Sequence, residues 1–81
     1  MSSRDKMLAR MRENPRDWRI EDLEALAAHF GLIVRKPGGS HVVFFHSRLP
    51  EMLSVPARRP IKPIYVRRFL SMIDELTGHE D

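Results

Sequence analysis

The stretch LIVRKPGGSHVVFFHSRLPEMLSVP, residues 32–56, contains three strand-like runs and decides the fold. The runs occupy 32–35, 41–46 and 51–55, and turn-forming residues at 37–39 and 47–50 separate them. β-Branched and aromatic residues, which favour strands, dominate the first two runs. Because short loops join consecutive strands, we expect an antiparallel meander of three strands.

Three flanking segments have the apolar spacing of amphipathic helices. The first is expected over about Ser3–Asn14, with Ser2 or Ser3 as its N-cap, and the second over about Glu21–Phe30. The third is expected over about Ile64–Leu76. The predicted order is therefore α-α-β-β-β-α, an α+β fold in which helices cover one face of the sheet and leave the other face open.

Alternation along the strands predicts which side chains share a face. Residues 41–46 divide into two sets: His41, Val43 and Phe45, and Val42, Phe44 and His46. Both sets are mostly apolar, so alternation alone does not select the buried one. In the third strand we expect Leu53 and Val55 to point inward and Ser54 outward.

The composition describes one small domain, expected to span residues 1–81 with its core at 21–77 and an extra N-terminal helix at about 3–14. The absence of cysteine excludes disulfides and thiolate metal sites and fits a reducing compartment. No apolar run approaches the roughly 18 residues of a membrane span. We therefore expect a cytoplasmic protein without a membrane partner.

Positive charge is concentrated in one part of the chain. The net charge is +3, but Arg35–Arg68 contains eight basic side chains and one acidic residue, Glu51. This segment is where a polyanion would bind. A solvated basic surface that serves only solubility remains the alternative.

The best candidate for chemistry is Gly38-Gly39-Ser40-His41, at the entry to the second strand. The glycines allow positive φ and close approach of a ligand. Histidine titrates near neutral pH, so His41 can take a proton from a ribose 2′-hydroxyl or give one to a leaving 5′-oxygen. Four cations are candidates for binding the phosphate: Lys36, Arg58, Arg59 and Lys62. That route needs no metal or cofactor.

Other interpretations of these residues stay open. A Gly-Gly turn is common before a strand, and a single histidine is often structural. His46 is either an inward, hydrogen-bonded residue, which we favour, or a second proton-transfer group. His29 is expected at the surface or its boundary, and His79 lies in an acidic tail. Tyr65 is expected at the edge of the core or near the site. No histidine or cysteine spacing typical of zinc is present.

The chain resembles the HicA family, the toxins of HicA–HicB toxin–antitoxin modules. The resemblance rests on Gly39-Ser40-His41 followed by Val42-Val43-Phe44, on Val55-Pro56, and on a basic proline-rich linker before a terminal amphipathic helix. It covers about 21–76. It implies a fold like the double-stranded-RNA-binding domain, ribonuclease activity on mRNA with His41 as the catalytic histidine, and neutralisation by a HicB-like antitoxin.

Two features depart from this resemblance. The helix at 3–14 precedes the part that most members share, and it either extends the core or makes a dimer contact. Val43 and Phe45 form an apolar pair on the His41 face, which either stacks RNA bases or is covered by the antitoxin. A non-catalytic RNA-binding module and a protein-interaction domain with a basic face are the alternatives to a ribonuclease.

Overall fold

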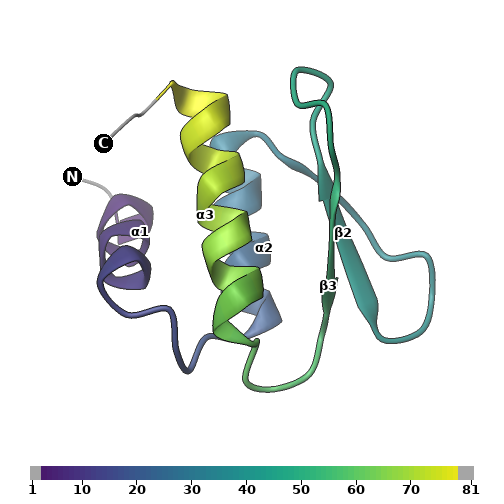
Figure 1. Cartoon of the computed structure of the whole chain (residues 1–81), viewed down its shortest axis with the longest axis horizontal. Coiled ribbons are helices and arrows are strands. Elements are labelled where there is room, and N and C mark those ends of the chain that lie inside the picture. The colour runs from purple at the N-terminus through teal and green to yellow at the C-terminus, as the bar shows by residue number, and fades with distance from the viewer. Residues whose placement is uncertain (1–2, 79–81) are drawn as a thin grey trace.

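The computed structural model describes residues 3–78 and has the predicted element order (Figure 1). The elements are α1 (Ser3–Glu13), α2 (Ile20–Phe30), β1 (Ile33–Arg35), β2 (His41–Phe45), β3 (Leu53–Pro56) and α3 (Pro63–Thr77). The third strand begins two residues later than expected. The expected N-cap Ser2 lies outside the described residues.

The three strands form an antiparallel sheet in the order β1-β2-β3, as predicted. The register pairs Ile33 with Phe45 in β1 and β2, and His41 with Pro56 in β2 and β3. The inward side chains of β2 and β3 are Val42, Phe44, Leu53 and Val55, all buried. His41, Val43 and Phe45 therefore belong to the open face, which alternation alone did not establish.

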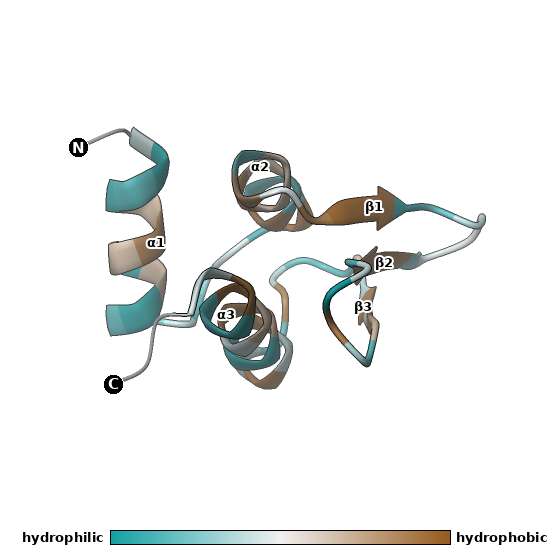
Figure 2. Cartoon of the chain, turned by 90° about the horizontal axis from the view of Figure 1, so that it is seen from above, coloured by the Kyte–Doolittle hydropathy of each residue, from teal (hydrophilic) through white to brown (hydrophobic). Residues whose placement is uncertain are grey.

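The helices form two layers on one side of the sheet (Figures 1 and 2). α2 and α3 pack directly against the sheet, and α1 packs on α2 and α3 from the opposite side. Counted from the sheet, the α2–α3 pair is therefore the second layer of the molecule and α1 is the third. None of the helices within residues 3–78 has both the length and the apolar character needed to cross a bilayer.

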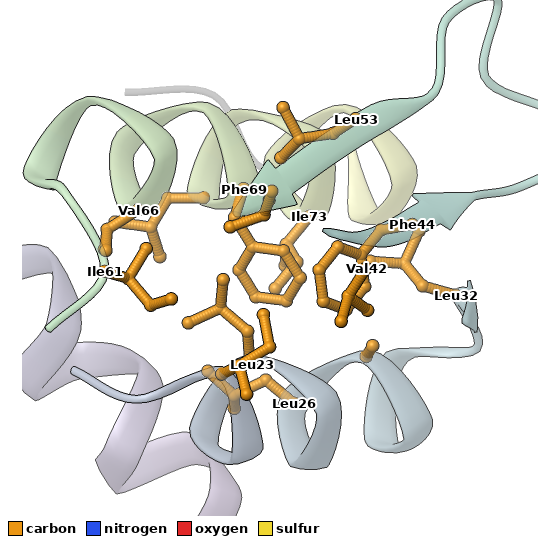
Figure 3. Packing of buried hydrophobic residues seen from close by; sticks show 14 of the residues in the cluster. Leu23, Leu26, Leu32, Val42, Phe44, Leu53, Ile61, Val66, Phe69 and Ile73 are labelled. Atoms are coloured by element: carbon orange, nitrogen blue, oxygen red, sulfur yellow. The ribbon is translucent and has the colours of Figure 1, made fainter. Parts of the chain in front are cut away.

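The core lies between the sheet and the two inner helices (Figure 3). Phe44 of β2 and Phe69 of α3 are both fully buried, and their rings meet at an interplanar angle of 66° with centroids 5.0 Å apart. Such edge-to-face pairs contribute about 0.5–1.5 kcal/mol beyond the burial of their area. Leu23 and Leu26 of α2 belong to the same buried cluster and are drawn beneath the two rings in Figure 3.

The contacts that join α1 to this core include a buried side chain and an ion pair to α3. Met11 has no exposed surface and belongs to the core cluster. Arg12 Nη1 donates a hydrogen bond to Asp74 Oδ2 of α3 at 3.0 Å. Of the two roles considered for this helix, extension of the core is the one these contacts describe.

We expect Met11→Ala to lower the free energy of unfolding by about 2–5 kcal/mol, because it removes a fully buried side chain and leaves a cavity. Chemical denaturation monitored by circular dichroism measures the change. Lys6→Ala, at an exposed position of the same helix, is the matched control. Equal stability of the Met11 variant and the wild type would contradict the assignment of α1 to the folded core.

Candidate functional site

The start of β2 is fixed against the end of β3. His41 pairs with Pro56 at the last position of the ladder. One residue further, the Ala57 N–H donates to the Ser40 carbonyl at 2.6 Å. The chain that leaves β3 therefore begins its path to α3 directly beside His41.

The connection between β3 and α3 forms a pocket with the start of β2. Figure 1 shows the connection running from the end of β3 to the first turn of α3. The pocket has a volume of about 670 Å³ and is lined by Ser40, His41, residues 56–63 and Tyr65. Ile61 anchors the connection: its side chain is buried, and its N–H donates to the Trp18 carbonyl at 2.9 Å.

His41 is exposed at the edge of this pocket. Its Nδ1 lies 3.5 Å from Ser40 Oγ, at the limit of a hydrogen bond. Within residues 3–78, Nε2 has no hydrogen-bond partner, so this nitrogen is available to a ligand. A ring held loosely through one nitrogen, with the other free, can exchange a proton with a bound hydroxyl.

Three of the four predicted cations line the same pocket, namely Arg58, Arg59 and Lys62. Arg59 Nη2 is 3.7 Å from Glu21 Oε2 of α2, and both side chains are about 60% exposed (62% and 60%). An ion pair that exposed is weak. Lys62 is also the N-cap residue of α3, so the positive end of the helix dipole lies at the same place.

Lys36, the fourth cation predicted to bind the phosphate, lies away from the pocket. Its Nζ lies 2.7 Å from Glu24 Oε2 of α2, and it is not among the residues that line the pocket. The pair joins the β1–β2 loop to α2. Lys36 therefore contributes to the general basic field, and its contact in the structure is with a carboxylate of its own chain.

Gly38 and Gly39 lie in the loop that leads to His41, outside the pocket lining. Their φ angles are +111° and +80°, and a Cβ added at either would meet no atom within 4 Å. The backbone conformation, rather than lack of space within the chain, is therefore what requires glycine. Phe45 lies outside the pocket as well, at the far end of β2.

Tyr65 was only a secondary candidate in the sequence, yet it lines the pocket while its ring packs against the core. Pro63 places it in the first turn of α3, so it faces the same connection as His41. Glu21 was not foreseen as a partner of Arg59. The signal for Tyr65 was its position two residues after a proline that starts a helix.

The other histidines have other surroundings. His46 is half-buried, and its Nδ1 accepts a hydrogen bond from the Arg48 N–H at 3.0 Å, so it belongs to the β2–β3 turn and is not fully inward. His29 is an exposed residue of α2, as predicted, and His79 lies outside the described residues. Within residues 3–78, no three His, Cys, Asp or Glu side chains are grouped so as to hold a metal ion.

We expect Gly39→Ala to lower the free energy of unfolding by about 1–2 kcal/mol, because an L-residue is strained at a φ of +80°. Ser40→Ala, one residue further and exposed, should change it by less than about 0.5 kcal/mol. Urea denaturation of both variants measures the difference. If Gly39→Ala is as stable as the wild type, the turn does not depend on the left-handed conformation.

Comparison with known proteins adds no assignment to this geometry. No protein-family model, no curated protein and no solved structure matches the chain.

Proposed function

We propose that this chain is a HicA-type toxin, a metal-independent endoribonuclease that cleaves mRNA with His41 and is neutralised by a HicB-like antitoxin. One observation carries the proposal. The pairing of His41 with Pro56 and the path of the chain after it put one histidine and three cations around a single pocket. A polyanion whose cleavage needs proton transfer fits that combination.

The proposed chemistry uses the nucleophile that RNA itself carries. A base removes the proton of the ribose 2′-hydroxyl, and the oxygen attacks the adjacent phosphorus. The bond to the 5′-oxygen breaks, that oxygen takes up a proton, and the products are a 2′,3′-cyclic phosphate and a 5′-hydroxyl. His41 would transfer one of these two protons, and Arg58 and Lys62 would stabilise the charge on the phosphoryl oxygens.

The arrangement of the later elements supports the finer fold assignment in this proposal. From α2 to α3 the order is α-β-β-β-α, with both helices on one face of an antiparallel sheet. A fold like the double-stranded-RNA-binding domain has that order. In this proposal α1 is an addition that stabilises the shared part through Met11.

We expect His41→Ala to lower the rate of RNA cleavage by about 10²–10⁴-fold, because it removes the group that transfers the proton. Cleavage of a single-stranded RNA by the purified protein, with EDTA present, measures the rate. Mass spectrometry of the wild-type products should find the 2′,3′-cyclic phosphate end. His29→Ala, which removes an exposed histidine on α2, is the matched control and should cleave at the wild-type rate.

The same assay separates the proposal from its alternatives. A His41→Ala variant that is folded by circular dichroism and cleaves at the wild-type rate would sink the assignment of His41. Wild-type protein that binds RNA and leaves it intact is a non-catalytic RNA-binding module. Wild-type protein with no RNA affinity at low salt is a protein-interaction domain.

We expect Arg58→Gln and Lys62→Gln each to reduce the slope of log affinity against log salt concentration by about 0.7, the value for one phosphate contact with a single strand. Titrations of a labelled RNA at several salt concentrations, with His41→Ala protein so that the RNA stays intact, give the slope. Lys6→Gln, on α1 in the third layer, should leave it unchanged. An unaltered slope in both pocket variants would place the phosphate contacts elsewhere.

A further inference from the structure

An apolar row crosses the open face of the sheet at the opposite end of β2 from His41. β1 and β2 pair Ile33 with Phe45. Ile33 is 49% exposed and Phe45 is half-buried. We call Ile33 and Phe45 the apolar row.

A cation lies on this row. The guanidinium carbon of Arg35 is 5.1 Å from the centroid of the Phe45 ring, within the range of a cation–π contact. Arg35 is paired with Val43, the next position of the ladder on the same face, so it reaches the ring from β1. A planar guanidinium on an aromatic ring offers a surface on which a nucleobase can stack.

The charge of the face favours a nucleic acid as the occupant. The outward strand residues of the sheet, all within the described part of the chain, include no carboxylate. Arg35, beside Val43, is the charged member of this face, and it lies between the level of Phe45 and that of His41. Stacking platforms for single-stranded nucleic acid combine aromatic rings with such a positive surround.

Phe45 of the apolar row and His41 of the pocket lie along one strand and on the same face of it. Phe45 is four residues from His41, and strands rise about 3.3 Å per residue, so about 13 Å separates them. A stacked strand of nucleotides advances about 3.4 Å each. A base on the row therefore belongs to a nucleotide up to about four positions from the phosphate beside His41.

We propose that the apolar row together with Arg35 is a stacking subsite for a base of single-stranded RNA that flanks the phosphate held in the His41 pocket. The inference rests on the proposed function only in taking RNA as the ligand. Binding along β2 selects RNA whose bases are free to stack. It also makes affinity depend on the length of the RNA.

The test compares two labelled oligouridylates, of three and of ten nucleotides, by fluorescence anisotropy at fixed low salt. All proteins carry His41→Ala, so that the RNA stays intact. We expect the longer RNA to bind more tightly. Phe45→Ala should reduce the ratio of the affinity for ten nucleotides to the affinity for three by about fivefold to a hundredfold. Phe45→Leu keeps an apolar side chain without the ring and should reduce the ratio similarly. Ser54→Ala, on the same face, is the matched control and should keep the ratio.

Each other outcome overturns the inference. An affinity ratio that is unchanged in both Phe45 variants rejects the proposed stacking subsite. A wild-type dimer in sedimentation that Phe45→Ala converts to a monomer, with the ratio unchanged, makes the row a protein interface. No RNA binding at low salt rejects both proposals.

The two proposals fail separately in the cleavage assay. A Phe45-dependent ratio in a protein that never cleaves RNA rejects the ribonuclease and keeps the subsite. Cleavage that depends on His41, with no Phe45-dependent ratio, rejects the subsite and keeps the ribonuclease.

Discussion

The contact between Phe44 and Phe69 decides which face of the sheet is available for function. It joins β2, the central strand, to α3, and both rings are fully buried. Because side chains alternate along a strand, an inward Phe44 requires that His41, Val43 and Phe45 point outward. A one-residue slip of β2 would turn His41 toward the core and expose Phe44, so packing and site geometry are fixed by the same interaction.

The register between β2 and β3 is the second constraint, and it acts on the connection rather than on the strand. With His41 opposite Pro56, the chain leaves β3 beside the histidine and carries Arg58 and Lys62 past it. Ile61 then holds the connection to the Trp18 carbonyl. A surface loop anchored at both ends and in the middle keeps its cations near one place, which a free loop would not do.

The sequence predicted the element order and the membership of the two strand faces, because apolar periodicity and turn residues are local signals. It did not identify the buried face, since both sets of side chains in β2 are apolar. It also did not identify the partners of Lys36 and Arg59. Glu24 and Glu21 lie twelve and thirty-eight residues from these cations, and only the packing of α2 beside the sheet and the connection brings each pair together.

These pairings change what the excess of positive charge in the later part of the chain means. Arg48 donates to the Leu76 carbonyl at the end of α3, Lys36 meets Glu24, and Arg35 lies over Phe45. Such contacts restrain the side chains to their own fold, whereas Arg58 and Lys62 form no ion pair among residues 3–78 and line the pocket. In the proposed ribonuclease, net charge would draw RNA toward the whole segment, and the cations without an ion pair among residues 3–78 would hold its phosphate beside His41.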